Sequence, residues 1–131
     1  MASKLYGNFL AKALNKEVDW DSDTIKVALL SSSYTPDQDT HTYFNNVSSY
    51  EVTGTGYSSG GATLASKTVS YDSANNVIIL DAADTTWSSS TITARYAVIY
   101  DDSGATAASK ALIGYVDFSS DQSSTNYNSR T

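Results

Sequence analysis

The sequence predicts a mainly β protein, an antiparallel β-sandwich or jelly-roll-like domain with one N-terminal α-helix. The chain contains 22 Ser, 15 Thr and 10 Tyr but only one Pro and one Met, and β-branched and aromatic residues favour strands. Short apolar runs recur at intervals of roughly 10 to 20 residues with turn-forming residues between them. Only the first segment has helical apolar spacing. The 131 residues therefore form one domain, residues 1–131, around a single core.

The predicted helix covers residues 3–17. Ser3 is a plausible N-cap, since its hydroxyl can accept a hydrogen bond from a free N–H of the first turn. Residues 15–17 would end the helix. We expect its apolar stripe to cover one end or face of the sheet, and docking on a partner chain is the alternative. The stripe consists of residues at helical spacing: Leu5, Phe9, Leu10, Ala13 and Leu14.

The predicted β core covers residues 24–118. Its first strand, 24–30, alternates so that Ile25, Val27 and Leu29 share one face. Segments 62–71 and 77–81 read as a hairpin around a five-residue loop. Strands are also expected at 91–100 and 111–118.

Alternation in the last two predicted strands indicates which side chains share a face. In the first of them, Tyr96, Val98 and Tyr100 are expected on one face, with Ala97 and Ile99 on the other. In the second, simple alternation gives two sets. The first set is Leu112, Val116 and Phe118, and the opposite set is Ile113 and Tyr115.

Three segments lack a clear strand pattern. Residues 31–49 form a long polar connection with a possible helical turn near 40–46, and loops of this length often carry function. Residues 54–61 contain four glycines, which indicates unusual backbone angles in a mobile or tightly turned loop. Residues 119–131 form a polar tail that we expect a partner chain to hold in place.

Composition argues against several classes of function. There is no cysteine, so disulfides, thiolate metal sites and cysteine nucleophiles are excluded. The net charge is −6 without a basic stripe, which argues against binding to nucleic acid or to an anionic membrane surface. No apolar run approaches the roughly 18 residues that a membrane-spanning helix needs.

Sequence motifs give little support for an enzyme. Residues 56–60 match G-x-S-x-G with Ser58 at the centre, but a nucleophile elbow needs a strand, a sharp turn and a helix, and here a strand is expected to follow. His41 is the only histidine and cannot form a zinc site alone. Asp19, Asp21 and Asp23 imitate the start of a calcium loop without its later ligands. We expect no catalytic residue, cofactor or metal.

The aromatic residues are the remaining unusual feature. Tyrosine offers a large apolar area with a polar end, so it favours protein interfaces and sugar-binding platforms. Packing against the small core is an equally supported alternative for several of them. The candidate interface residues lie in or beside probable loops and in the tail: Tyr34, Tyr43, Phe44, Tyr50, Tyr57 and Tyr127.

Several stretches of this sequence resemble a family of small structural proteins of tailed phages and prophages. The matching stretches, together with Trp87 and the opening helix, are DTIKV (23–27), YEV (50–52), GTGY (54–57), GGATL (60–64), TITARYAVIYDD (91–102) and LIGYVDF (112–118). They cover most of residues 3–118. Members of this kind often continue with a further strand, whereas this chain ends in the tail. A partner chain could supply the missing sheet edge.

The resemblance implies a non-enzymatic virion protein without catalytic residues. We expect it to decorate or cement the capsid through contacts with the major capsid protein or other virion proteins. It would be a homo-oligomer or be present in many copies per particle, on the capsid surface rather than the tail. The alternative is a tail or fibre accessory module that binds a host receptor or carbohydrate.

Overall fold

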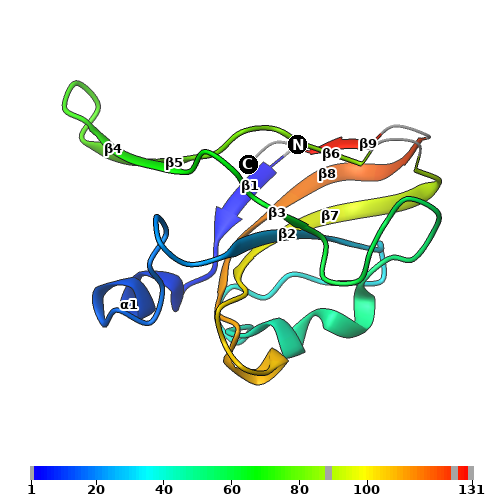
Figure 1. The fold of residues 1–131 in the computed structure, drawn as a ribbon, viewed down its shortest axis with the longest axis horizontal. Coiled ribbons are helices and arrows are strands. Elements are labelled where there is room, and N and C mark those ends of the chain that lie inside the picture. The colour runs from blue at the N-terminus through cyan, green and yellow to red at the C-terminus, as the bar shows by residue number, and fades with distance from the viewer. Residues whose placement is uncertain (1, 88–89, 125–126, 130–131) are drawn as a thin grey trace.

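The computed structural model describes residues 2–87, 90–124 and 127–129, and it confirms a mainly β, antiparallel, sandwich-like architecture (Figure 1). A five-stranded sheet has the order β1-β8-β7-β2-β3, and the pairs β4-β5 and β6-β9 form separate two-stranded sheets. The elements are β1 (Ala2–Leu5), α1 (Phe9–Leu14), β2 (Ile25–Leu30), η1 (Phe44–Asn46), η2 (Ser48–Tyr50), β3 (Ala62–Thr63), β4 (Thr68–Asp72), β5 (Val77–Asp81), β6 (Thr85–Trp87), β7 (Ile92–Asp101), η3 (Ala107–Ser109), β8 (Leu112–Ser124) and β9 (Tyr127–Ser129).

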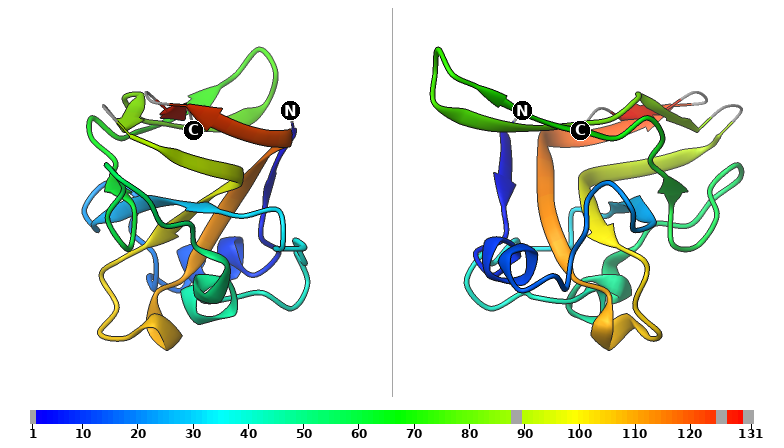
Figure 2. Two further views of the ribbon diagram at one scale, coloured as in Figure 1. Left: turned by 90° about the vertical axis from the view of Figure 1, so that its right-hand side faces the viewer. Right: turned by 60° about the vertical axis from the view of Figure 1, so that its left-hand side comes forward.

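The five-stranded sheet is covered on both faces. Strand β2 shows why, because its side chains alternate between two hydrophobic clusters. Ile25, Val27 and Leu29 are fully buried on one face as predicted, while Ala28 and Leu30 are fully buried on the other. Trp87 of β6 and Leu80 at the base of the β4–β5 hairpin pack in the cluster on the first face, and the rest of the hairpin extends beyond the sheet in Figure 2. The connection containing η1 and η2 covers the second face.

An irregularity in the β7–β8 pairing lets both halves of β7 contribute to the core. The register moves from Ala94 opposite Gln122 to Tyr96 opposite Asp117. Arg95 lies at this bulge, and its Nε atom is 2.7 Å from Asp117 Oδ1. Between these two pairs β7 has one residue, Arg95, whereas β8 has four, residues 118–121. The alternation of β7 changes phase at this irregularity, so Ala94 and Ala97 both lie in the first cluster. The predicted faces of residues 96–100 are confirmed.

The predicted faces of residues 112–118 are wrong. A second irregularity, between Ile99 opposite Gly114 and Tyr100 opposite Leu112, leaves Ile113 as an extra residue. The alternation therefore changes phase. Leu112 and Tyr115 lie in one cluster, while Ile113, Val116 and Phe118 belong to the other.

The N-terminal helix is shorter than the predicted 3–17. Residues Ala2–Leu5 instead form β1, which pairs with β8 and so gives an otherwise open strand edge its backbone partners. The chain then turns, with Phe9 N donating to Tyr6 O at 3.1 Å, and Gly7 N donates to Gln38 O at 2.9 Å, which ties the turn to the connection 31–49. The last helical residue is Leu14, with Asn15 as the C-cap, so the helix also ends before the predicted residue 17. Lys16 adopts a left-handed φ of 64°, and Glu17 N donates to Lys12 O at 2.8 Å, which together make a Schellman cap.

The predicted hairpin is shorter at its N-terminal end. Ala62–Thr63 pairs with β2, and only Thr68–Asp72 pairs with Val77–Asp81. Asp72 stabilises the connecting turn, because its Oδ1 accepts hydrogen bonds from the N–H groups of Ala74 and Asn75. This hairpin projects away from the rest of the chain in Figure 1.

The tail does not depend on a partner chain for its backbone pairing. Strand β8 continues to Ser124, where residues 122–124 pair with the start of β7. Residues Tyr127–Ser129 pair with β6. Residues 122–124 and 127–129 thus pair within the chain, and the expectation that a partner chain holds the tail stays a prediction. Within the described ranges, no helix is long and apolar enough to cross a bilayer.

Candidate functional site

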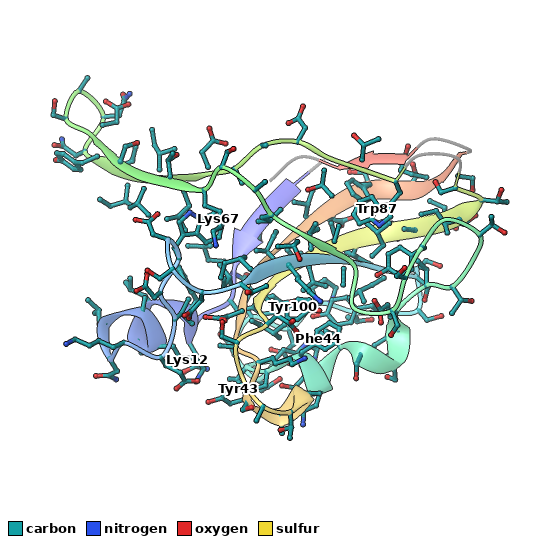
Figure 3. The ribbon with its side chains drawn as sticks, viewed as in Figure 1. Lys12, Tyr43, Phe44, Lys67, Trp87 and Tyr100 are labelled. Atoms are coloured by element: carbon teal, nitrogen blue, oxygen red, sulfur yellow. The ribbon has the colours of Figure 1, made fainter. Side chains whose placement is uncertain are left out.

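Two of the predicted interface residues are core residues. Tyr34 is 1% exposed, and its hydroxyl lies 2.7 Å from Tyr6 Oη and 2.9 Å from His41 Nδ1. Phe44 is buried and stacks on Tyr100, with ring centroids 4.1 Å apart (Figure 3). The prediction that Tyr34 and Phe44 contact another chain is therefore wrong. Both rings face inward because the connection 31–49 covers one face of the sheet.

Tyr43, Tyr50 and Tyr57 are partly buried. Tyr43 contacts residues near the helix: Lys12 Nζ donates to its Oη at 3.1 Å, and Tyr43 Oη donates to Glu17 Oε2 at 2.9 Å (Figure 3). Tyr50 packs against Tyr34, with ring centroids 5.5 Å apart. The side chain of Tyr127 lies outside the described part of the chain. Tyr43, Tyr50 and Tyr57 do not form the exposed aromatic platform that the sequence suggested.

Tyr57 instead secures the glycine-rich loop to the sheet. Its hydroxyl donates to Glu51 Oε2 at 2.5 Å and accepts from Leu29 N at 3.0 Å. Burial, followed by the Glu51 carboxylate, raises the pKa of Tyr57, so the hydroxyl keeps its proton. Gly60 N also donates to Glu51 Oε2, at 2.7 Å. These hydrogen bonds hold the loop on the sheet, and its four glycines adopt positive φ.

Ser58 lacks the setting of a nucleophile elbow. It lies in a turn in which Gly61 N donates to Ser58 O at 3.0 Å, and the strand β3 follows. An elbow needs a helix at that point. The predicted strand after Ser58 is confirmed, which favours the structural interpretation of this motif.

The carboxylates of the acidic turn at residues 19–23 accept hydrogen bonds from backbone N–H groups of the same turn. Asp19 Oδ1 accepts from Ser22 N at 3.2 Å, and Asp23 Oδ2 accepts from Asp19 N at 3.0 Å. In the part of the chain that the structure describes, no group of three or more His, Cys, Asp or Glu side chains is placed to hold a metal ion. These carboxylates therefore act as turn-stabilising groups.

A buried carboxyl, Asp101, lies at the end of β7. It is 3% exposed, and its Oδ1 accepts from Ser103 N at 2.9 Å. Among the described residues, its Oδ2 has no hydrogen-bond donor. Burial, followed by the neighbouring Asp23 carboxyl, raises the pKa of Asp101 to about 7. Asp101 therefore binds a proton far more readily near neutral pH than an ordinary aspartate does.

The surface feature that stands out is apolar. Two groups of large apolar side chains are more than 40% exposed, one on β1 and α1 and one on the β4–β5 hairpin. We call the hairpin, residues 68–81, the arm. The exposed side chains are Leu5, Leu10, Leu14, Val69, Tyr71, Val77, Ile78 and Ile79.

A cleft of about 430 Å³ separates the arm from α1, and we call it the arm cleft. A smaller hollow of about 230 Å³ shares Leu5, Trp20 and Leu80 with it and continues along β1 and β8. Almost all of the cleft surface is apolar. The residues that line the arm cleft are Leu5, Phe9, Leu10, Ala13, Val18, Trp20, Val69, Ile78 and Leu80.

Two polar contacts hold the root of the arm in place. Trp20 Nε1 donates to Thr68 O at 3.1 Å, while the Trp20 ring is buried in the core. Lys67 Nζ donates to Asp23 O (Figure 3). The arm cleft is therefore open because the arm is fixed at its base and extends beyond the body.

Sequence reasoning missed this site, although a signal was present. Residues 77–80, VIIL, are four consecutive apolar residues, and a two-stranded hairpin can bury at most one face of them. In the stripe Leu5 to Leu14, Phe9 is buried but three leucines are exposed. Comparisons with models of protein families, with curated proteins and with solved structures find no match for this chain.

Proposed function

We propose that this chain is a non-enzymatic structural protein of a tailed-phage virion. It decorates or cements the capsid surface through contacts with the major capsid protein, in many copies per particle. The observation that carries the proposal is the exposed apolar surface of the arm and its cleft. Soluble monomers rarely leave such contiguous apolar patches open, and large patches mark contacts with other proteins.

The construction of the molecule supports a contact role. Its sheet is packed on both faces, so the scaffold is rigid, and the arm extends from it with exposed apolar side chains. A rigid scaffold loses little conformational entropy when it binds. Repeated copies on a shell would add avidity to each weak contact. The resemblance to tailed-phage structural proteins supports the same proposal.

A receptor- or carbohydrate-binding module of a tail or fibre is less well supported. That alternative needs exposed aromatic platforms, but Tyr34 and Phe44 are buried. Tyr43 and Tyr57 use their hydroxyls in hydrogen bonds within the chain. The exposed surface is mostly aliphatic, which suits protein contacts better than stacking on sugars.

The proposal can be tested by adding purified chain to phage heads assembled without it. After sedimentation of the heads, we expect bound chain to saturate at a reproducible ratio to the major capsid protein. Tails from the same phage serve as the control. Failure to saturate on heads, or stronger binding to tails than to heads, would contradict capsid decoration.

A further inference from the structure

The two strands of the arm place their apolar side chains on one face. Val69 lies opposite Leu80, and Tyr71 lies opposite Ile78, and directly paired residues point to the same side of a hairpin. Leu80, at the root, is partly buried, whereas Tyr71 and Ile78 are 58% and 64% exposed. Near the tip of the arm, the apolar face that lines the cleft is therefore not covered by other described residues of the same chain.

The opposite wall of the cleft is also left uncovered. Leu10 and Leu14 are one helical turn apart, so they lie on the same side of α1, and they are 62% and 76% exposed. Leu5 on β1 adds a third exposed side chain, at 53%. One chain thus carries an apolar arm and an apolar wall, each lacking a partner among the described residues.

We propose that a second copy of this chain occupies the arm cleft in a two-fold dimer, in which each arm packs against the α1 wall of the other copy. A two-fold axis brings the same pair of surfaces together twice. A cleft of about 430 Å³ accepts roughly three benzene-sized groups, since a cavity of about 150 Å³ holds one. The side chains of Tyr71 and Ile78 from the second copy, which are mostly exposed in their own chain, fit within that volume.

The available area agrees with a dimer interface. The wall and the cleft-facing side of the arm comprise six side chains that are 47% to 76% exposed, namely Leu5, Leu10, Leu14, Val69, Tyr71 and Ile78. At roughly 150 Å² for each large side chain, they offer about 500 Å² of apolar surface per copy. A standard interface takes about 800 Å² from each partner, and about 65% of a homodimer interface is apolar.

The side of the arm that faces the cleft is apolar. Asp72 and Asp81 pair with Val77 and Thr68, so they lie on the same face as Ile79 and point away from the arm cleft. The choice of a second copy as the occupant therefore rests on the matching apolar areas of the arm and the wall.

This dimer rests on the proposed function, because it names a second copy on the shell, beside the capsid protein, as a partner of the exposed apolar surface that carries that proposal. Sedimentation velocity over a concentration series tests it on the full chain. We expect a monomer–dimer equilibrium for the wild type and at least tenfold weaker association for Ile78→Lys. The matched control is Ile79→Lys, since Ile79 is 42% exposed on the other face of the same strand. Circular dichroism shows whether each variant remains folded.

Cross-linking provides a second measurement that does not depend on lysine variants. The chain has no cysteine, so Tyr71→Cys and Leu10→Cys each introduce a single thiol. Mixed under mild oxidation, the two variants should form a disulfide-linked heterodimer faster than either forms a homodimer. A wild type that stays monomeric at several hundred micromolar, or equal loss of association in both lysine variants, overturns the proposal.

The outcomes separate this dimer from the proposed function. A monomeric chain that saturates phage heads overturns the arm exchange and leaves capsid decoration standing. A dimer that binds no heads overturns capsid decoration and leaves the exchange standing. An absence of cross-linking between Tyr71→Cys and Leu10→Cys, with association intact, also contradicts the exchange.

Discussion

Replacing Asp101 by Asn should remove most of the pH dependence of stability near neutrality. Asp101 is buried next to Asp23, and these surroundings raise its pKa from 3.8 to about 7. A pKa above the unfolded value means that the folded state binds the proton more tightly. The stabilisation is therefore fully present below about pH 4, and it is lost as the pH rises through 7.

The expected size of this effect follows from the pKa. One pKa unit corresponds to about 1.4 kcal/mol, so linkage gives a decrease of up to about 2 kcal/mol in the free energy of unfolding between pH 5.5 and pH 8. For a chain of this length, that is roughly 6–10 °C in Tm. The pKa values of Asp23, Asp37 and Asp102 are lowered, so these groups stay ionised throughout this interval.

Urea unfolding at pH 5.5, 6.5, 7.5 and 8 measures the effect. We expect the wild type to lose stability with rising pH, and Asp101→Asn to change by less than about 0.5 kcal/mol over the same interval. Asp37→Asn is the control and should keep the wild-type slope, because Asp37 titrates well below this range. A wild type that becomes more stable toward pH 8, or an unchanged slope in Asp101→Asn, would refute the raised pKa of Asp101.

Three further predictions concern the loops and the arm. Gly61→Ala should destabilise the fold by about 2–4 kcal/mol in thermal unfolding, because a Cβ there would lie 1.9 Å from Val27 O at a φ of 84°. The control Gly60→Ala should lose only about 1 kcal/mol. Gly60 has a similar φ of 92°, but the atom nearest to its added Cβ lies 3.4 Å away. Tyr57→Phe should lose about 1–3 kcal/mol in urea unfolding, because the Glu51 carboxylate and Leu29 N lose a partner, whereas Tyr71→Phe at the exposed arm should change little. Trp20→Phe removes the bond to Thr68 O, so amide exchange in residues 68–81 should accelerate several-fold relative to β7.

The alternation of β2 and of the second half of β7 was predictable, because both faces of the sheet are buried and the period of two residues is strict. The change of phase at Arg95 and at Ile113 was not, since it depends on the register between β7 and β8, which alternation within one segment does not reveal. The predicted helix start at residue 3 was wrong for a related reason. The pairing of Ala2–Leu5 with β8 overrides the local helical pattern.

The candidate site illustrates the same limit. Sequence reasoning treated tyrosines beside loops as interface residues, but Tyr34 lies in a connection that covers a sheet face, and so it is buried. The apolar pattern of residues 77–80 predicts a strand, but it does not indicate whether another layer covers that strand. Only the three-dimensional arrangement shows that this strand lies in a two-stranded arm without a layer beneath its tip.

The proposed role in a virion can be measured by quantitative mass spectrometry of purified particles, separated into heads and tails. A capsid-decorating chain is expected in hundreds of copies per particle and is expected to be retained with the head fraction. Absence from purified particles, or a few copies confined to tails, would contradict it.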